Sequence, residues 1–293
     1  MPDRVGQDTD RPGYDTMTGM GAVRLAAASA HFGRDLDFCV TRIKGIIGDA
    51  RKAGAVLLVL PDAALGGYLA DLRHPDPNAL PPALPRDDAL FDELAREAGE
   101  LVVVLGYTEA VDEDRYNAAI CLTGTGTLGH YRKVHQPPGE ALVFRAGDRF
   151  AAFDTPAGRL GLLIDYDKSF PEAARTLALD GAEIIALPCA WPASVTNRAA
   201  RLVNDRQSRL FDLYDSARAA ENQVVVVSAN QTGTMGGLRF LGQSKIVGPG
   251  GEVLARTYAT GGLAVAELDV QAEIRRARQV QHHLNERRPG LYS

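Results

Sequence analysis

Three charged side chains stand where strand-like apolar segments of the sequence end, and α/β proteins commonly hold their functional groups at such junctions. Asp62 follows the first of these segments, Lys133 ends the second and Asp165 ends the third. Two carboxylates that converge on one ammonium keep it charged, and their mutual repulsion separates their proton affinities. The three residues therefore predict a cluster for general acid-base chemistry, which could also activate a water molecule.

Each of the three residues also has a common role outside catalysis. A strand-end Asp such as Asp62 usually caps a turn, and an isolated Lys such as Lys133 is usually a solvated surface residue. Asp165 follows the apolar run Leu160–Ile164, where an unpaired carboxylate is costly, so it requires a partner. Lys133 is that expected partner, and the pair fits a purely structural role as well as a catalytic one.

The elements that would position these residues alternate apolar runs with amphipathic segments. No long linker, repeat or low-complexity stretch divides the chain, so we expect one α/β domain over residues 22–293 and a flexible polar tail over residues 1–21. The pattern predicts strands over Val23–Ala30, Ala55–Leu60, Leu101–Tyr107, Asn117–Leu122, Thr127–Lys133, Phe150–Asp154, Leu160–Asp165, Glu183–Leu187 and Val224–Ala229, a hairpin over Gln243–Leu268, and helices over Arg34–Ala53, Arg86–Gly99, Pro171–Asp180 and Arg198–Asn222.

The composition of the 293 residues excludes several classes of protein. Hydrophobic residues make up 45% of the chain and charged residues 24%, as in ordinary globular proteins. The net charge of −5 argues against nucleic acid as a partner, and no apolar run approaches the roughly 20 residues that span a bilayer. The three cysteines are far apart and the N-terminus lacks the layout of a signal peptide, so we expect a cytoplasmic protein.

Several motifs, taken in order, resemble those of one known family. They are Val59–Asp62, Tyr131–His135, Pro138–Glu140, Gly161–Asp167, Phe170–Glu172, Pro188–Pro192, Arg218–Asn222 and Gly242–Ser244. Together they resemble the nitrilase superfamily, also called carbon-nitrogen hydrolases, from Val23 to about Tyr292. Any one motif alone would be weak, and the set in its expected order is specific.

The resemblance implies an αββα sandwich of two mixed sheets flanked by helices, and a site built from Glu, Lys, Cys and often a second Glu. In this chain the position of the nucleophilic Cys is Asp165, and the position of the general-base Glu is Asp62. Lys133 keeps its place, and Glu140 matches the second Glu, where it either orients Lys133 or forms a loop salt bridge. The chain therefore departs from the family at two of three central positions.

The departure at Asp165 changes what the site can do. A thiol has a pKa of about 8.5, close to the value of about 10 for an amine, so a thiolate and an amine leave a tetrahedral intermediate with similar ease. A carboxylic acid has a pKa of about 3.9, so a carboxylate leaves far more readily than the amine. The acyl-enzyme would also be a mixed anhydride. We therefore expect acid-base chemistry, such as cyclisation, dehydration or water addition, in place of thioester-mediated hydrolysis.

Other residues are candidates for the walls of the pocket. Tyr68, Tyr166, Cys189 and Trp191 are the expected substrate-binding residues, although the aromatic side chains fit the core equally well. Cys189 is also a possible substitute nucleophile, but a free Cys is most often a small buried hydrophobe. No phosphate-binding glycine loop, nucleotide fingerprint or metal-spaced cluster occurs, so we expect no cofactor and no metal.

The sequence leaves two other functions open. One is a residual carbon-nitrogen hydrolase, similar to an amidase, in which Asp165 directs water at the substrate. The other is a catalytically dead protein that binds a ligand or a partner. The expected substrate in the enzymatic readings is a small amide-, nitrile- or amine-containing metabolite. The resemblance also implies a homodimer or a larger even-numbered homo-oligomer, with subunit contacts made by the C-terminal segment.

Overall fold

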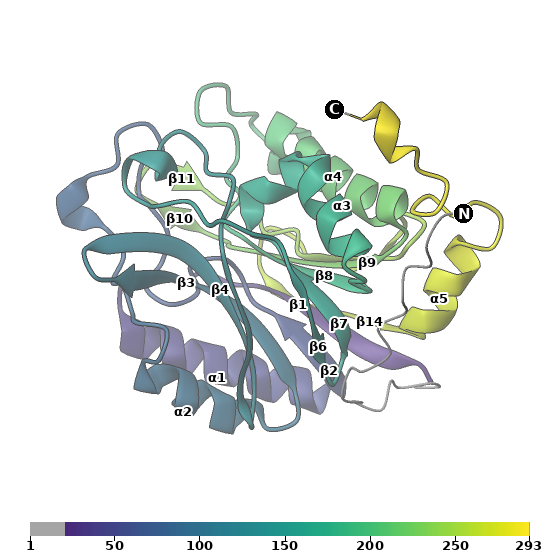
Figure 1. Cartoon of the computed structure of the whole chain (residues 1–293). Helices are drawn as coiled ribbons and strands as arrows, with labels where there is room; N and C mark the ends of the chain where they lie inside the picture. The colour runs from purple at the N-terminus through teal and green to yellow at the C-terminus, as the bar shows by residue number, and fades with distance from the viewer. Residues whose placement is uncertain (1–20, 293) are drawn as a thin grey trace, which may run out of the picture.

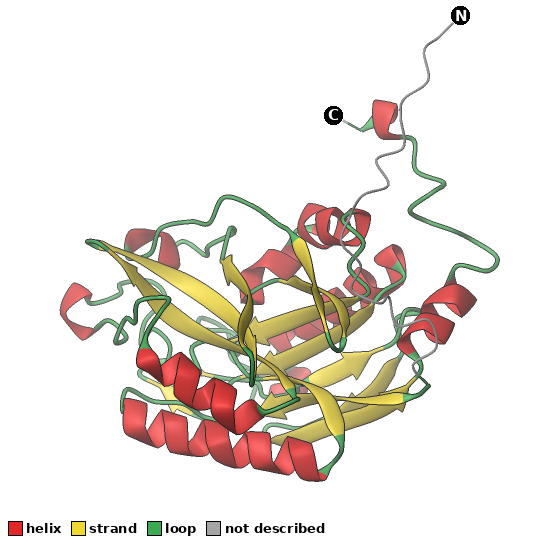
Figure 2. Cartoon of the chain, turned by 60° about the horizontal axis from the view of Figure 1, so that its bottom comes forward, coloured by secondary structure: helices red, strands yellow, loops and turns green. Residues whose placement is uncertain are grey.

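Two six-stranded sheets face each other in the computed structural model, which describes residues 21–292. Helices α1 (Leu36–Lys52) and α2 (Ala89–Ala98) cover one sheet, and α3 (Pro171–Leu179) and α4 (Arg206–Asn222) cover the other (Figure 1). Figure 2 shows the same layers from another side, with the strands between the helices. The predicted arrangement of two mixed sheets flanked by helices is confirmed.

The first sheet combines parallel and antiparallel strands. Its strands are, in spatial order, β14 (Gly262–Leu268), β1 (Val23–Ser29), β2 (Ala55–Val59), β3 (Val102–Val111), β4 (Asp114–Thr123) and β5 (Gly126–Arg132). β1, β2 and β3 are parallel, while β4 is antiparallel to both β3 and β5. β2, β3 and β5 therefore end at the same edge of the sheet, where the loop after β2 and the loop after β5 meet.

The second sheet repeats this plan. Its strands are, in spatial order, β13 (Val253–Arg256), β12 (Lys245–Val247), β9 (Val225–Asn230), β8 (Ile184–Cys189), β7 (Gly158–Leu162) and β6 (Ala152–Thr155). β7, β8 and β9 are parallel, and every residue of the central strands β8 and β9 is buried. Strands covered on both faces have the near-continuous apolar sequence seen here.

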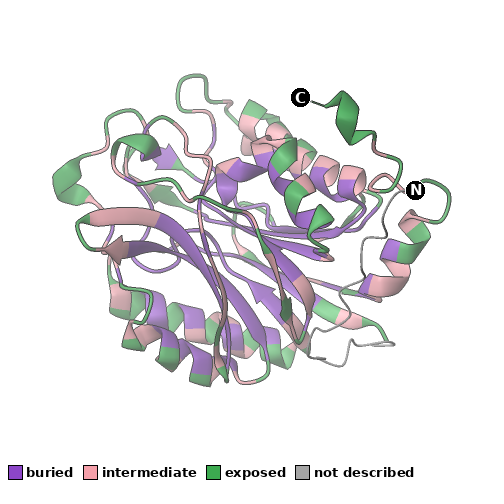
Figure 3. Ribbon diagram, viewed as in Figure 1, coloured by how far each residue is buried: buried purple, intermediate pink, exposed green. Residues whose placement is uncertain are grey.

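Three apolar layers hold the sheets and helices together. One lies between the first sheet and helices α1 and α2, one between the two sheets, and one between the second sheet and helices α3 and α4. In α1 the spacing of Ile43, Ile47 and Ala50 places all three on the buried face of the helix. Figure 3 shows the consequence, because the strands between the helices are mostly buried and the outer helix faces are exposed.

The remaining elements are short. They are the strands β10 (Thr234–Met235) and β11 (Leu238–Arg239), the helix α5 (Val270–Ala277), and the 3₁₀ turns η1 (Pro77–Ala79), η2 (Glu140–Leu142), η3 (Asp165–Ser169), η4 (Leu202–Asn204) and η5 (Pro289–Leu291). After α5 the chain passes the end of α4, where Gln223 Nε2 donates to the Gln281 carbonyl at 2.7 Å, and its last turn, η5, lies apart from the two sheets (Figures 1 and 2). Two of the turns, η2 and η3, carry candidate site residues.

Several predicted elements have different bounds in the structure. The hairpin expected over Gln243–Leu268 is formed by β12 and β13 only, and β14 pairs with β1 in the first sheet. The helix expected from Arg198 begins at Arg206, because the side chain of Asp205 accepts a hydrogen bond from Gln207 N at 2.9 Å and caps the helix there. The strand expected to run to Asp165 ends at Leu162, and Asp165 begins η3 instead. The last two corrections arise from local hydrogen bonds that hydrophobic periodicity does not report.

Two other expectations concern the ends of the chain and the membrane. The predicted tail over residues 1–21 lies, apart from Gly21, outside the described residues. Over residues 21–292, no helix is long and apolar enough to cross a membrane.

Candidate active site

Four predicted site residues meet at the edge where strands of both sheets end. Asp62 follows β2, Lys133 follows β5, Glu140 begins η2 and Asp165 begins η3. Lys133 Nζ lies 2.8 Å from Glu140 Oε1 and 3.4 Å from Asp165 Oδ2. The expected pairing of Lys133 with Asp165 is present, and Glu140 is its second partner. We call these four residues the Lys133 cluster.

Hydrogen bonds from neutral groups complete the cluster. Asn117 Nδ2 donates to Asp62 Oδ2 at 3.0 Å and lies 3.5 Å from Glu140 Oε1. The Tyr68 hydroxyl also donates to Glu140 Oε1. Asn117 on β4 therefore holds the Asp62 carboxyl group, and Tyr68 in the loop after β2 holds the Glu140 carboxyl group.

The backbone of Asp62 joins the two sheets. Its N–H donates to the Cys189 carbonyl at the end of β8, at 3.2 Å. Its carbonyl accepts a hydrogen bond from Gln231 Nε2 at 2.9 Å, just after β9. Gln231 Oε1 in turn accepts from Phe32 N at 3.0 Å. Asp62 is thus held by the second sheet as well as by its own.

The Lys133 cluster is almost entirely out of contact with solvent. Asp62, Lys133 and Glu140 have no exposed surface, and Asp165 is 5% exposed. Over residues 21–292, Lys133 is the only cation within 4.0 Å of any of the three carboxylates. Buried charges need close compensation. With one ammonium for three carboxylates, the cluster has an excess of negative charge unless it also binds protons.

The pKa values within the cluster follow from this imbalance. Burial raises the pKa of Asp62 most strongly, and although Lys133 opposes this, Glu140 and Asp165 raise it further, to about 8. The pKa of Glu140 is also raised, chiefly by burial. Burial lowers the pKa of Lys133, but the surrounding carboxylates outweigh it and raise that pKa above its usual range. Lys133 therefore stays charged, and Asp62 holds a proton at neutral pH.

Asp165 has an unusual backbone conformation. Its φ is 48°, in the left-handed region that non-glycine residues rarely adopt, and its Oδ1 accepts a hydrogen bond from Ala190 N at 3.2 Å. Asp167 anchors the same turn, because its Oδ2 accepts from Ile164 N at 3.0 Å and from the Tyr131 hydroxyl at 2.7 Å. The turn η3 therefore bends sharply and directs Asp165 toward Lys133.

Three of the predicted substrate-binding residues have side chains outside the Lys133 cluster. Trp191 packs edge-to-face on Phe211 and Tyr214 of α4, and Tyr166 packs on Phe170. Cys189 is fully buried, and burial raises the pKa of its thiol. The structure brings Tyr68 into contact with the cluster, but the side chains of Tyr166, Cys189 and Trp191 belong to the apolar layer under α3 and α4.

Asn117 and Asp167 are contributors that sequence reasoning missed. Asn117 begins the apolar run of β4, on the same face as Ala119 and Cys121, so its amide points between the sheets. A polar residue at an inward position of a buried strand is the signal that would have identified it. Asp167 stands in the matched motif beside Asp165, but nothing in its spacing indicated that it binds Tyr131.

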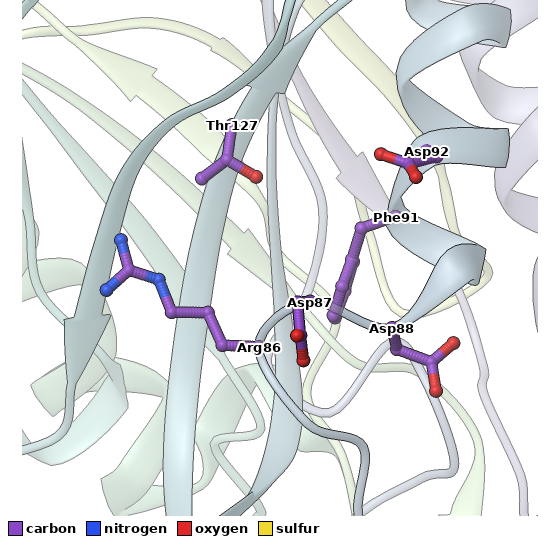
Figure 4. Close-up of a pocket in the computed structure, with 6 residues that line it drawn as sticks. All are labelled: Arg86, Asp87, Asp88, Phe91, Asp92 and Thr127. Atoms are coloured by element: carbon purple, nitrogen blue, oxygen red, sulfur yellow. The ribbon is translucent and has the colours of Figure 1, made fainter.

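A pocket near the start of α2 is separate from the Lys133 cluster. It is lined by Arg86, Asp87, Asp88, Phe91, Asp92 and Thr127 (Figure 4). Within residues 21–292, no group of three or more His, Cys, Asp or Glu side chains is arranged to hold a metal ion.

Comparison with known proteins identifies the family. The family model described as carbon-nitrogen hydrolase matches residues 24–279. A nitrilase from Pyrococcus abyssi is 34% identical over 234 residues, which cover 78% of this chain and 83% of the relative. An N-carbamoylputrescine amidase from Arabidopsis thaliana is 30% identical over 88% of this chain and 90% of its own length. The chain belongs to the carbon-nitrogen hydrolase family, also called the nitrilase superfamily.

Solved structures have the same fold. The carbon-nitrogen hydrolase from Helicobacter pylori superposes with a TM-score of 0.80 at 24% identity and covers 93% of this chain and 97% of its own. A mutant amidase from Nesterenkonia sp. AN1 superposes with a TM-score of 0.74 at 25% identity, covering 92% and 95%. That amidase has the acetamide moiety of fluoroacetamide covalently added at its active site cysteine. The predicted nitrilase-like αββα sandwich is confirmed.

Replacement of Gly106 tests whether β3 must leave space for Asp62. A Cβ at Gly106 would lie 2.6 Å from Asp62 Cα and 2.7 Å from Ala63 N, so backbone would have to move. We expect Gly106→Ala to lower the free energy of unfolding by about 1–3 kcal/mol, measured by urea denaturation. The control is Gly45→Ala on the exposed face of α1, where nothing lies within 4 Å and a gain of about 0.5–1 kcal/mol is expected. Equal effects of the two changes would contradict the packing argument.

The raised pKa of Asp62 also predicts how stability depends on pH. Between the ordinary value of 3.8 and the folded value of about 8, the folded chain holds a proton that the unfolded chain has released. Stability contributed by this proton is therefore lost as pH rises through that range, by up to about 1.4 kcal/mol per pH unit, and is constant above it. Asp62→Asn cannot ionise and should lack this part of the slope in urea denaturation between about pH 5 and pH 8.

The control for the pH experiment is Glu113→Gln, a change at an exposed position after β3. It should keep the pH dependence of the wild-type chain. If the stabilities of wild type and Asp62→Asn differed by the same amount at every pH, Asp62 would not hold the buried proton.

Proposed function

We propose that this chain is a carbon-nitrogen hydrolase-family enzyme that performs acid-base chemistry on a small amide-, nitrile- or amine-containing metabolite. The observation that carries the proposal is the buried Lys133 cluster, in which one ammonium faces three carboxylates. By resemblance to the family, Asp165 stands where the nucleophilic Cys is expected and Asp62 stands where the general-base Glu is expected. Cyclisation, dehydration and water addition are reactions that such a cluster can catalyse.

The proposed roles follow from the charges of the individual groups. Asp62, whose pKa is raised to about 8, holds a proton at neutral pH and donates it. Asp165, which accepts a hydrogen bond from Ala190 N and pairs with Lys133, acts as the proton acceptor. Lys133 remains charged and stabilises negative charge that develops on the substrate. Glu140, at 2.8 Å from Lys133 Nζ, orients that ammonium.

Water addition to a nitrile illustrates how the two carboxyl groups work together. Asp165 takes a proton from water as the water oxygen bonds to the nitrile carbon, and Asp62 gives its proton to the nitrile nitrogen. The imidic acid that forms tautomerises to the amide, and one proton transfer between the carboxyl groups restores the starting state. Dehydration of an amide is the same sequence in reverse. No acyl-enzyme is needed in either direction.

A second function is favoured by the names of the relatives. Nitrilases and amidases are among them, so hydrolysis of a carbon-nitrogen bond by water that Asp165 directs is the alternative. It differs from the first proposal in its product, because hydrolysis of an amide or nitrile releases ammonia and water addition to a nitrile does not.

Turnover of a panel of small amides, nitriles and N-carbamoyl compounds tests these proposals. Product analysis by mass spectrometry and an ammonia assay should find a substrate that is converted without ammonia release. Asp165→Asn and Lys133→Ala should each reduce its turnover by at least about 100-fold, the usual contribution of a general acid or base. If both variants kept wild-type turnover of that substrate, the acid-base proposal would be lost.

A double variant separates an altered enzyme from an inactive one. Asp165→Cys with Asp62→Glu restores the residue types that the family resemblance expects. Ammonia release by the double variant alone would show that the site accepts amides or nitriles and that the wild-type chemistry differs. Ammonia release by the wild type would favour the hydrolase alternative, and binding without turnover by any form would favour a ligand-binding protein.

The charge of the cluster also predicts the charge of the substrate. Besides Asp62, the carboxyl groups of Glu140 and Asp165 lie within 4 Å of the one ammonium. A ligand carboxylate would add a fourth acidic group to a buried site with a single ammonium. The proposed substrate is therefore neutral or cationic.

Three amides of similar size test this selectivity by calorimetric binding. γ-Aminobutyramide is cationic, valeramide is neutral and succinamate is anionic. We expect succinamate to bind at least about tenfold more weakly than γ-aminobutyramide, a difference of about 1.4 kcal/mol. Asp165→Asn removes one negative charge and should narrow the difference, while Glu113→Gln at the surface should not. Preferential binding of succinamate by the wild type would contradict the prediction.

We further propose a cytoplasmic homodimer or larger even-numbered assembly. All three cysteines are free and buried, which suits a reducing compartment. The C-terminal segment after α5 ends in η5, which lies apart from the sheets, and it exposes Val280, Leu291 and Tyr292, at 90%, 76% and 60%. Apolar side chains at that level of exposure suit a contact with a second subunit.

A further inference from the structure

A second buried ionic cluster lies behind η3, on the side away from Lys133. Lys168 Nζ lies 2.9 Å from Asp215 Oδ1, and Lys245 Nζ lies 2.9 Å from Asp215 Oδ2. The side chains of all three residues have no exposed surface. Asp215 belongs to α4, Lys245 to β12 and Lys168 to η3. We call these residues the Lys168 cluster.

The cluster is held by aromatic rings as well as by charge. Lys168 Nζ lies 3.3 Å from the centre of the Phe211 ring and 4.9 Å from that of Trp191, and Lys245 Nζ lies 3.8 Å from the centre of the Phe211 ring. Burial raises the pKa of Asp215, but the two ammonium groups outweigh it and lower that pKa. The three groups therefore form a buried ionic unit in the apolar layer under α4, and Asp212, 3.0 Å from Lys245 Nζ, supplies a second carboxylate for the two ammonium groups.

One face of α4 is directed at η3. Phe211, Asp215 and Arg218 are spaced by four and three residues, so they lie along one stripe of the helix. Phe211 and Asp215 bind the Lys168 side chain, and Arg218 Nε donates to the Lys168 carbonyl at 2.8 Å. Arg218, which belongs to a motif of the family resemblance, thus binds the backbone of Lys168, while Asp215 binds the Lys168 side chain.

Lys168 is connected to the Lys133 cluster in two ways. It lies three residues after Asp165 in the same five-residue turn, so a movement of one displaces the other. Its Nζ also lies 3.9 Å from Cys189 Sγ, and the next residue, Ala190, donates its N–H to Asp165 Oδ1. The Lys168 cluster therefore contacts both backbone segments that define the position of Asp165.

The conformation of Asp165 requires such support. A non-glycine residue in the left-handed region is strained, and it persists only where surrounding contacts determine its position. Asp167 holds η3 from the side of the first sheet, through Tyr131. Lys168 is the corresponding anchor on the opposite side, through α4.

We propose that Lys168, held by Asp215, is a positioning residue that sets the approach of Asp165 to Lys133. The inference rests on the proposed function of the Lys133 cluster, because it assigns the geometry of that cluster to a residue outside it. Lys245 provides a matched comparison. It binds the same carboxylate and is equally buried, but it stands on β12 and does not belong to η3.

The test uses a thiol as a reporter, so it does not depend on turnover. In chains that carry Asp165→Cys, the rate of alkylation by iodoacetamide at residue 165 is measured against pH by peptide mass spectrometry. A thiol beside the Lys133 ammonium has a lowered pKa. The three natural thiols are buried and their pKa values are raised, so they form a slow background.

Lys168→Met should move the introduced thiol away from Lys133. We expect the midpoint of its alkylation profile to rise by about one pH unit, which reduces the rate at neutral pH about tenfold. Lys245→Met should lower the melting temperature of the chain but leave the midpoint unchanged. Stability and positioning are thereby measured separately in two variants that each remove one buried ammonium.

The double variant Lys168→Met with Asp215→Asn keeps the experiment decisive if Lys168→Met alone unfolds. It removes both charges of the pair, while Lys245 keeps Asp212 as a partner at 3.0 Å. It should recover stability relative to Lys168→Met and retain the raised midpoint. An unchanged midpoint of the alkylation profile in the folded Lys168 variants, or an equal rise of that midpoint in Lys245→Met, would overturn the proposal. The turnover experiment is independent of this one, so failure of the acid-base proposal there would not change the alkylation result.

Discussion

The compensation of one buried ammonium determines how this structure is built. Lys133 has no exposed surface and keeps its charge only because Glu140 and Asp165 lie within 4 Å of it. Those partners come from different parts of the chain, one from η2 and one from η3, so the ion pairs require the two sheets to meet at this edge. Asp62 adds a backbone hydrogen bond to Cys189 across the same edge. The electrostatics of one lysine and the packing of the two sheets are therefore coupled.

The turn η3 shows how that requirement reaches the rest of the fold. Its five residues contain three charged side chains with different partners: Asp165 faces Lys133, Asp167 binds Tyr131, and Lys168 binds Asp215 on α4. A short turn with a strained backbone cannot by itself keep three side chains directed at three different partners. The outer helix α4 supplies the missing constraint through its buried face. The third layer of the sandwich thus takes part in the geometry of the site.

Apolar periodicity predicted an α/β domain with mixed sheets and the strand ends that carry Asp62, Lys133 and Asp165, because it reports elements and where they stop. The αββα sandwich and Glu140 were implied by the family resemblance. Sequence reasoning did not predict Asn117 or the anchoring by Asp167, since both act through contacts between distant segments. Substrate binding by Trp191 and Tyr166 stays a prediction, and in the structure Trp191 packs on Phe211 and Tyr214 of α4 while Tyr166 packs on Phe170. The helix expected from Arg198 begins at Arg206 because one capping carboxylate decides its start.

By resemblance to the family, Asp165 and Asp62 stand where a Cys and a Glu are expected, and the charges of these two side chains interact. A neutral thiol at the position of Asp165 would leave the cluster with one fewer negative charge. Burial is the main cause of the raised pKa of Asp62, and Glu140 and the carboxylate of Asp165 raise it further, to about 8, so Asp62 retains a proton at neutral pH. A base that holds its proton becomes an acid. Under the proposed function, Asp165 in η3 takes up a proton and Asp62 after β2 gives one, and this division of roles suits the pair to moving protons between substrate and water.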